Sequence, residues 1–472
     1  MKKIVKFISI SIKPIIIKIL ELFSKLFSFL GKIFFPFRSF FSKFTKVFGG
    51  WEKIAILSFL IIIGICSVFL GYRKYYDQTK PVSAFGGKYV EGLVISNSSD
   101  LDQINQKLTK IGLTYFDNSG ILQPALADKW EISDDGKIYT FTLKNGIDSN
   151  VLSATVKKVK TSWLDIGIET PDSKTLKFSL KEPYSPFLNN TSEPIFDLGP
   201  YKQTNQDRSS LQFTARDDFI FGKPYIQNIE IRIYPNEENL LKALHKKEII
   251  GIAEVNEPVA TINSYLMNLP RYQVAFFNLN KSQFQNKNVR QKIKNNQKLD
   301  KEITAVLVTN DQDTNLVKAD ELKSQWDKIG LKVEIRSFNS LDLQKTVILN
   351  RDYDILLYGI DYGYDPDPYP FWHTSQMSST GLNLSNFSNQ KADQLLEDAR
   401  KTTDQTIRTQ KYVDFQKILD DEVPAIYLNQ ITWKYGVSDQ VKDAIQHNGF
   451  TPADRFNEIW KWYIETRRVF KS

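Results

Sequence analysis

The sequence predicts an α/β fold preceded by a transmembrane helix, and two features carry this prediction. An apolar stripe at helical spacing is followed directly by an apolar strand in residues 237–253, and the same pattern recurs in residues 318–335. Repeated helix–strand units build a sheet that helices cover. Ahead of them, Ile54 to Leu70 is an uncharged run of seventeen residues, which is close to the length that crosses a bilayer.

Residues 1–50 are apolar and basic at once, a pattern typical of a helix that lies in the lipid interface. Eleven Lys or Arg residues against two Glu give residues 1–53 a net charge of +9, which leaves −1 for the rest of a chain whose total is +8. This distribution places the N-terminus in the cytoplasm and the large body outside the cell membrane. The nearly neutral body lacks the basic face that nucleic-acid binding requires, so we predict no nucleic-acid partner.

Residues 51–76 are predicted to form a single-pass membrane anchor with aromatic residues at both ends. A cleaved signal peptide is disfavoured because the basic region is too long and no small-residue cleavage site follows the apolar run. Cys66 follows the bulky Ile65, where a lipoprotein cleavage site requires a small residue, so we interpret it as a membrane-buried thiol. As the only cysteine lies in this run, the body has no disulfides.

The body is expected to begin near Lys88, after a polar tether in residues 77–87. Strands at 129–132 and 138–143 flank a Ser-Asp-Asp-Gly turn, which indicates a β-hairpin. Residues 165–180 repeat this pattern around a Pro-Asp-Ser turn. We expect the two hairpins to lie in one small sheet.

The two helix–strand units have matching signals. In the second, the apolar stripe of residues 318–328 is ended by Gly330, and residues 331–335 alternate into a strand. In the first, the stripe of residues 237–247 precedes an apolar strand at 249–253. For this architecture, two lobes with a cleft between them are the natural binding geometry.

The stretch from Tyr358 to His373 combines three carboxylates, three prolines and seven aromatic or histidine rings. It follows the apolar run of residues 353–358, so its acids and rings are expected where a buried strand emerges into a loop. In open α/β sheets, ligands bind at such strand ends. Pro366 and Pro368 exclude a helix across the acidic part. The alternative interpretation is a proline-stiffened surface loop whose aromatic side chains are half buried.

Enzyme and metal motifs are lacking from the sequence. The three histidines are scattered, no H-E-x-x-H, G-x-S-x-G or phosphate-binding loop occurs, and no thiol lies outside the membrane. Asp361, Asp365 and Asp367 offer oxygen ligands for Ca²⁺, but the intervening prolines fit no EF-hand loop. His373 alone is a weak basis for a nickel site. We therefore predict a protein that is no enzyme and that has no cofactor or metal site.

Several short segments of the body occur in the same order as the motifs of a known protein family. They are LADKWEISDDG at 126–136, GPY at 199–201, GKPY at 222–225, NVRQ at 288–291, LKSQWDKIGLKVEIR at 322–336, the stretch from Tyr358 to His373 and the helical region 383–428. Together they resemble the family 5 extracellular solute-binding proteins, the peptide- and nickel-binding receptors of bacterial ABC importers. GGKYVEG at 86–92 and WKWY at 460–463 are similar to the membrane-anchored branch in small-genome bacteria.

The resemblance implies a two-lobed periplasmic-binding-protein-like (type II) fold with an extra small β-rich subdomain. Lobe 1 and the subdomain would span residues 88–235, lobe 2 residues 236–430, and residues 431–472 would return to lobe 1 and form the tail. The family normally carries several dozen more residues between positions 291 and 303, so we expect a trimmed second lobe and a shallower or altered cleft.

In the family, extended peptides lie between the lobes, and an acid pairs with the ligand's N-terminal ammonium. The family's A-D-Y-x-D-P-like loop matches Asp361-Tyr362 best, which makes Asp361 the expected ammonium partner. Asp365 and Asp367 are the nearby alternatives. Tyr358, Tyr362 and Trp372 are the expected walls, and core packing is the other interpretation of Trp372.

The sequence thus predicts a membrane-anchored extracytoplasmic solute-binding protein that delivers peptides, or another small solute, to the permease of an ABC transporter. The alternative is a degenerate relative that keeps the fold and serves as a membrane-tethered interaction or scaffold protein, which the trimmed lobe motivates. A hydrolase is the third and weakest hypothesis.

Overall fold

The computed structural model of the 472-residue chain describes residues 50–94, 98–159, 165–254, 262–444 and 448–471. The chain divides into two compact units, one formed by residues 1–82 with 468–472 and the other by residues 83–467. Apart from Gly50, the interfacial segment expected in residues 1–50 lies outside the described residues.

The first unit contains helix α3, Gly50–Gln78, and most of two paired strands, β1 (Thr79–Ser83) and β18 (Thr466–Phe470). Among the described residues, one segment, Ser58–Gln78, is long and apolar enough to cross a membrane by length and composition. Arg468 lies over the ring of Tyr76, with 3.7 Å between the guanidinium carbon and the ring centroid, and its Nε donates to Thr79 Oγ1 at 2.7 Å. These contacts fasten the last strand to the end of the helix.

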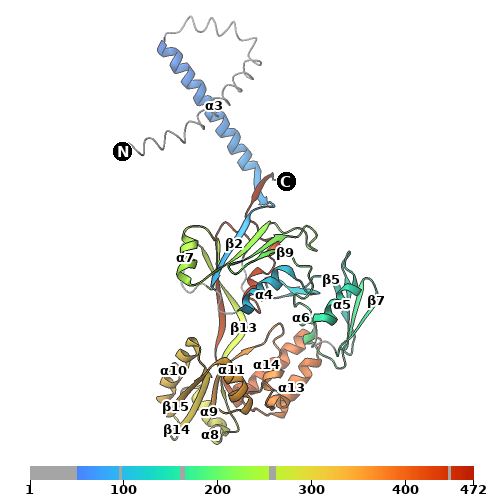
Figure 1. Ribbon diagram of the computed structural model, residues 1–472, viewed down its shortest axis with the longest axis vertical. Coiled ribbons are helices and arrows are strands. Elements are labelled where there is room, and N and C mark those ends of the chain that lie inside the picture. Colours follow the sequence, from blue (N-terminus) through green and yellow to red (C-terminus); the bar gives the residue numbers. More distant parts are fainter. Residues whose placement is uncertain (1–49, 95–97, 160–164, 255–261, 445–447, 472) are drawn as a thin grey trace. The chain divides into compact units, whose positions relative to one another are not determined.

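A ten-stranded sheet organises the second unit, in the order β15-β14-β16-β13-β17-β12-β2-β11-β10-β9. Its longest strands are β13, of 15 residues, and β17, of 13 residues. These two antiparallel strands run through both lobes and connect them (Figure 1). The strands of this sheet are β2 (Lys88–Val94), β9 (Tyr201–Gln206), β10 (Ser210–Ala215), β11 (Asn228–Tyr234), β12 (Gly251–Ala253), β13 (Asn263–Phe277), β14 (Ile303–Asn310), β15 (Leu331–Phe338), β16 (Ile355–Asp361) and β17 (Ala425–Val437).

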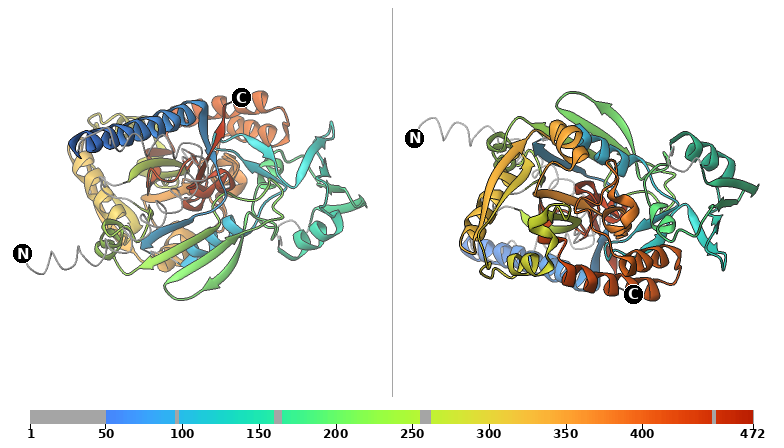
Figure 2. Two further views of the ribbon diagram at one scale, coloured as in Figure 1. Left: turned by 90° about the horizontal axis from the view of Figure 1, so that it is seen from above. Right: turned by 90° about the horizontal axis from the view of Figure 1, so that it is seen from below.

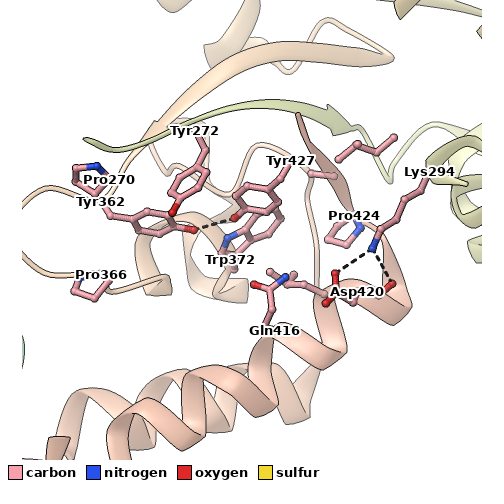
Figure 3. A pocket seen from close by; sticks show the side chains of 13 residues that line it. Pro270, Tyr272, Lys294, Tyr362, Pro366, Trp372, Gln416, Asp420, Pro424 and Tyr427 are labelled. Carbon is pink, nitrogen blue, oxygen red and sulfur yellow. Dashed lines mark hydrogen bonds and ion pairs between the residues drawn. The ribbon is translucent and has the colours of Figure 1, made fainter. Parts of the chain in front are cut away.

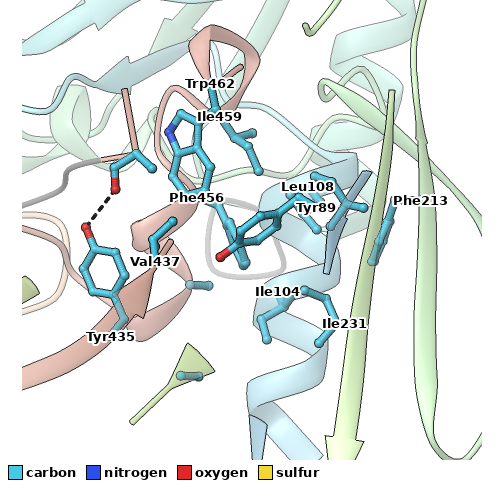
Figure 4. Close-up of a cluster of buried hydrophobic side chains, with 14 of the residues drawn as sticks. Tyr89, Ile104, Leu108, Phe213, Ile231, Tyr435, Val437, Phe456, Ile459 and Trp462 are labelled. Atoms are coloured by element: carbon cyan, nitrogen blue, oxygen red, sulfur yellow. Dashed lines mark hydrogen bonds between the residues drawn. The ribbon is translucent and has the colours of Figure 1, made fainter. Parts of the chain in front are cut away.

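Lobe 1 has helices on both faces of its part of the sheet. Helix α4, Ser98–Thr109, covers one face, where Tyr89 packs edge-on against Trp462 (Figure 4). Helix α7, Glu237–His245, packs its buried Leu240 with Val90 on the other face. Strand β12 pairs with β2, and its Ile252 shares the buried cluster of α7. The apolar stripe of α7 predicts that one face of the helix is buried, but it does not predict which strands of the sheet that face contacts.

The small subdomain is a four-stranded antiparallel sheet in the order β5-β6-β8-β7, so the two expected hairpins do lie in one sheet. In the ribbon views it projects to the side opposite α10 (Figure 2). Its buried core includes Tyr139, Phe141, Phe178 and Phe187. Its elements are β5 (Ala127–Ile132), β6 (Ile138–Leu143), α5 (Ser149–Val159), β7 (Gly167–Asp172), β8 (Thr175–Ser179) and α6 (Pro186–Asn190), with β3 (Thr114–Phe116) and β4 (Leu122–Pro124) paired beside them.

Lobe 2 is covered on both faces by helices. The second helix–strand unit is confirmed, because α10 (Asp313–Asp327) is followed by Gly330 at φ +94° and then by β15. The core on this face surrounds Trp326 and includes residues of α8 (Ser282–Gln285) and α9 (Lys287–Lys294). A separate core surrounds Trp372 and includes residues of α13 (Gln390–Lys401) and α14 (Gln405–Glu422). Short helical turns complete the lobes: α11 (Ser340–Asp342), η3 (Leu343–Ile348), α12 (Tyr369–Trp372), η4 (Thr374–Met377), η5 (Pro452–Phe456) and η6 (Ile459–Lys461).

The junction between the lobes is an irregularity in strand β13. Asn268 pairs with Thr432 and Tyr272 pairs with Gln430, so three residues of β13, 269–271, face one residue of β17. Proline cannot donate to a sheet ladder, which accounts for Pro270 at this bulge. The loop after β16 is fixed there, because Tyr362 N donates to Pro270 O at 3.0 Å.

Candidate functional site

The loop that follows β16 lies directly beside this junction. Strand β16 ends at Asp361, which is the cross-strand partner of Arg271 in β13. The chain then turns at Gly363, whose φ of +64° suits glycine and whose N–H donates to Asp361 Oδ1 at 2.9 Å. The acidic part through Pro368 is free of regular helix, as its prolines predict, and α12 begins at Tyr369.

Asp361 forms an ion pair at the surface of the junction. Its Oδ2 accepts from Arg271 Nε at 2.7 Å, and the side chains of Asp361 and Arg271 are 47% and 34% exposed. Water screens such a pair, so we expect it to add little to folding stability. The carboxylate therefore stays reachable by a solute.

Asp365 forms a buried pair with Arg408 of α14. Both nitrogen tips of the guanidinium bind the carboxylate, and Asn189 Nδ2 donates to Asp365 Oδ2 at 2.9 Å. The side chains of Asp365 and Arg408 are only 4% and 3% exposed. Burial by itself lowers the pKa of Arg408, but its hydrogen bonds to Asp365 and the charge of that carboxylate outweigh burial and raise the pKa above its ordinary value.

Asp367 is bound by Arg400 of α13. Its Oδ2 accepts from Arg400 Nε at 2.7 Å and lies 2.6 Å from Nη2, while Tyr369 N donates to Oδ1 at 3.1 Å. The guanidinium of Arg400 also lies over the ring of Tyr369, which stacks on His373 with 4.1 Å between ring centroids. These contacts hold the acidic part of the loop against lobe 2.

The same region fastens the small subdomain to lobe 2. Ser185 N donates to Arg400 O at 2.7 Å, and Ser185 Oγ donates to Ala399 O at 3.1 Å, both at the end of α13. Asn189 of α6 adds its bond to Asp365. Burial raises the pKa of Tyr139 to about 12, with Arg408 and Asp365 close enough to affect it in opposite directions. The subdomain is thus joined to lobe 2 by contacts that do not pass through β13 or β17.

Two hollows flank the loop and share Tyr362. The acid pocket has a volume of about 260 Å³ and is lined by Tyr184, Pro186, Asn190, Asp361, Tyr362, Asp365, Asp367, Pro370, Phe371 and Leu382. The aromatic pocket has a volume of about 460 Å³ and is lined by Pro270, Tyr272, Lys294, Tyr362, Pro366, Trp372, Gln416, Leu419, Asp420, Pro424, Ala425, Ile426 and Tyr427 (Figure 3).

Three rings of the aromatic pocket bring polar atoms together. The hydroxyls of Tyr362 and Tyr427 are hydrogen-bonded at 2.8 Å, and the nitrogen of Trp372 points toward them (Figure 3). Trp372 is 1% exposed, and its Nε1 has no hydrogen-bond partner among the residues that the structure describes. Burial raises the pKa of both phenols, and the nearby indole N–H lowers each pKa by a smaller amount. The indole N–H does not reach hydrogen-bond geometry with either phenol oxygen.

Comparisons with known proteins agree with this architecture. The family model of bacterial extracellular solute-binding proteins, family 5 middle, matches residues 149–295. The probable D,D-dipeptide-binding periplasmic protein DdpA of Escherichia coli strain K12 is 24% identical, over 67% of this chain and 81% of that protein. Over residues 149–295 the chain is therefore similar to the family 5 solute-binding proteins.

Solved structures of binding proteins show the fold of the chain. The substrate-binding protein CtaP of Listeria monocytogenes superposes with a TM-score of 0.66 at 20% identity, covering 81% of this chain and 100% of that chain. The oligopeptide-binding protein AppA of Bacillus subtilis, solved with a nonapeptide, gives a TM-score of 0.60 at 17% identity, with coverage of 81% and 100%. The family consists of extracytoplasmic binding proteins of ABC importers rather than enzymes.

In the structure, the predicted site residues fall into three groups. Asp361, Tyr362, Asp365 and Asp367 line the acid pocket, and Tyr362 and Trp372 line the aromatic pocket. Tyr358 lines neither pocket, and its hydroxyl accepts from Gln344 Nε2 at 3.3 Å. Within the described residues, no three His, Cys, Asp or Glu side chains gather as a metal site.

Sequence reasoning missed the partners of these residues. Arg271, Arg400 and Arg408 each bind one of the three carboxylates, and Tyr427 completes the phenol pair. One signal was present for Arg408, since it lies on the buried stripe of α14 with Phe415 and Leu419, seven and eleven residues further along. A charged residue at such a position calls for a buried partner.

Proposed function

We propose that the chain is a membrane-anchored receptor outside the cytoplasm that delivers peptides to an ABC transporter. The observation that carries the proposal is the half-exposed carboxylate of Asp361 at the junction of two lobes. The other two carboxylates, Asp365 and Asp367, are at most 7% exposed and already hold guanidinium groups. Among the three, Asp361 is therefore the one open to a peptide ammonium.

Binding would exchange partners at Asp361. The ammonium of an extended peptide takes the place of Arg271 or shares the carboxylate with it, and Tyr362 forms the adjacent wall. Main-chain hydrogen bonds of the peptide would ignore side-chain identity, which suits a receptor for many sequences. The relative AppA of Bacillus subtilis, which is solved with a nonapeptide, supports a peptide as the solute class.

The ammonium contact is tested with tetra-alanine and N-acetyl-tetra-alanine, titrated by calorimetry into the full chain in detergent micelles. A hydrogen bond to a charged group contributes about 1.5–3 kcal/mol, so the acetylated peptide is expected to bind at least tenfold more weakly. Asp361→Asn should remove this difference. Asp218→Asn is the matched control, because Asp218 pairs with Arg216 on the surface of lobe 1. Equal affinities for both peptides in the wild-type chain would refute the role of Asp361.

Membrane anchoring by α3 is a separate part of the proposal. Its support is the apolar segment Ser58–Gln78, together with the positive charge that precedes it in the sequence. The full chain should stay with the membrane fraction after an alkaline carbonate wash, and protease added outside intact cells without a wall should cut the body. Recovery of the intact chain in the soluble fraction would exclude a stable anchor.

A second candidate function is a membrane-tethered interaction protein without a transport ligand. The contacts of Ser185 and Asn189 favour it, because they tie the subdomain to lobe 2 and oppose separation of the lobes. Mass spectrometry of small molecules that copurify with the full chain separates the two candidates. A trapped peptide supports the receptor, whereas an empty protein that no peptide library stabilises against heat supports the second candidate.

A further inference from the structure

The aromatic pocket has the size of a ligand site. Its volume of about 460 Å³ falls within the range of about 300–1,000 Å³ that is typical of small-molecule pockets. Its walls come from β13, β17, α9, α12, α14 and the loop after β16, so six segments of lobe 2 converge on it. Rings and prolines make up about half of the lining residues, which gives the pocket stiff apolar walls.

Hydrogen-bond donors without acceptors lie in this pocket. The N–H of Trp372 is buried and has no hydrogen-bond partner in the part of the chain that the structure describes. Tyr362 and Tyr427 bond to each other, so one hydroxyl donates and the hydrogen of the other has no acceptor among the described residues. Figure 3 shows the two hydroxyls and the indole nitrogen close together. Buried donors are costly to leave unpaired, so this arrangement calls for an acceptor from outside the chain.

The charges of the pocket cancel. Lys294 and Asp420 are its ionisable residues apart from the tyrosines, and Lys294 Nζ lies 3.0 Å from Asp420 Oδ1. A charged ligand would therefore find no unpaired counter-ion in the lining. Burying such a charge is unfavourable, which selects against both anions and cations.

We propose that the aromatic pocket binds an uncharged, ring-sized apolar group that carries a hydrogen-bond acceptor such as an amide carbonyl. The acceptor receives the N–H of Trp372 and the free hydroxyl of the Tyr362–Tyr427 pair, while the apolar body packs on Tyr272 and Pro366. This site shares Tyr362 with the acid pocket but does not use Asp361, so it does not depend on the proposed delivery of peptides.

Three fluorinated probes of the same size test the proposal: 4-fluorobenzamide, 4-fluorobenzoate and 4-fluorobenzylammonium. Their binding to the full chain is followed by ¹⁹F NMR at a fixed detergent concentration, so that partition into micelles is the same in every sample. The neutral amide should bind at least tenfold more tightly than either ion. Comparable binding of benzoate or benzylammonium, or no binding of the amide above the micelle background, would overturn the proposal; the latter result fits a pocket that holds water only.

Four variants locate the site. Tyr362→Phe combined with Tyr427→Phe removes the free hydroxyl, and Trp372→Phe removes the indole N–H; each should weaken binding of the amide about fivefold to tenfold. Trp372 is part of a core, so Gln416→Trp provides a variant that leaves the core intact: Gln416 is exposed on α14, and the larger ring would fill the pocket. Gln416→Trp should abolish binding, and Tyr225→Phe in lobe 1 should leave it unchanged. Unaltered binding by Gln416→Trp would place the amide elsewhere and refute the site.

Discussion

The acid pocket and the aromatic pocket share Tyr362 but differ in how their polar groups are satisfied. In the acid pocket, each of the three carboxylates already binds an arginine from another element. In the aromatic pocket, the buried N–H of Trp372 and one phenol hydroxyl have no acceptor among the described residues. The three carboxylates, which the sequence marks as candidate ligand contacts, are thus already paired with arginines of the protein. The aromatic rings, which resemble ordinary core residues in the sequence, keep free hydrogen-bond donors.

Within the acid pocket, two ion pairs differ in how far they are exposed to solvent. Asp365 and Arg408 are almost fully buried, and their bond also holds Asn189 of the subdomain. Asp361 and Arg271 are about half and one third exposed. A buried pair is costly to break because one charge is left without a partner, whereas an exposed pair is replaced by water. We infer that Asp365 serves the fold and that Asp361 is available to a ligand.

The largest expected effect is the loss of stability in Asp365→Ala. The variant leaves the buried guanidinium of Arg408 unpaired, so the free energy of unfolding should fall by about 3–5 kcal/mol. Urea denaturation of the full chain, followed by tryptophan fluorescence, measures it. Replacing both partners, as Asp365→Leu with Arg408→Met, should recover most of the loss. If the double variant is as unstable as Asp365→Ala, the bond to Asn189 rather than the unpaired charge explains the effect.

An intermediate effect is expected at alkaline pH from the phenol pair of the aromatic pocket. Burial raises the pKa of Tyr362 and Tyr427 in the folded protein. Above about pH 10 the unfolded chain loses these protons while the folded chain keeps them. Stability contributed by the pair is thus complete below that pH and declines as the pH rises toward the folded pKa values.

The double variant Tyr362→Phe with Tyr427→Phe isolates this contribution. Its melting temperature should fall less steeply than that of the wild type between about pH 9.5 and 11. Other buried tyrosines, such as Tyr201, remain in both proteins and set the common background. Identical slopes would mean that the two phenols ionise in the folded state as easily as in the unfolded chain.

The sequence predicted elements whose signals are local. The unit of α10 and β15, the two hairpins and the apolar helix follow from spacing, turn residues and run length over short stretches. The ion pairs of the site do not, because their partners are separated by 90, 43 and 33 residues along the chain. The pairing of Arg271 with Asp361 depends on strand register, which composition does not specify. The free N–H of Trp372 is likewise visible only once its neighbours are placed.

The smallest effect on stability, and the sharpest test of the comparison, is expected for Arg271→Ala. Removing one member of an exposed pair should lower the free energy of unfolding by about 0.2–1 kcal/mol. Among the described residues, the same change leaves Gly363 N as the one hydrogen-bond donor to the Asp361 carboxylate, which becomes more available to a peptide ammonium. Tetra-alanine should then bind more tightly than to the wild type, while N-acetyl-tetra-alanine should not.

Arg336→Ala, which breaks the exposed pair with Glu334, serves as the control and should alter neither affinity. Weaker binding of both peptides by Arg271→Ala would show instead that the guanidinium itself contacts the ligand. Arg271 would then join Asp361 as a ligand contact, in contrast to the two buried acids, which are bound within the protein.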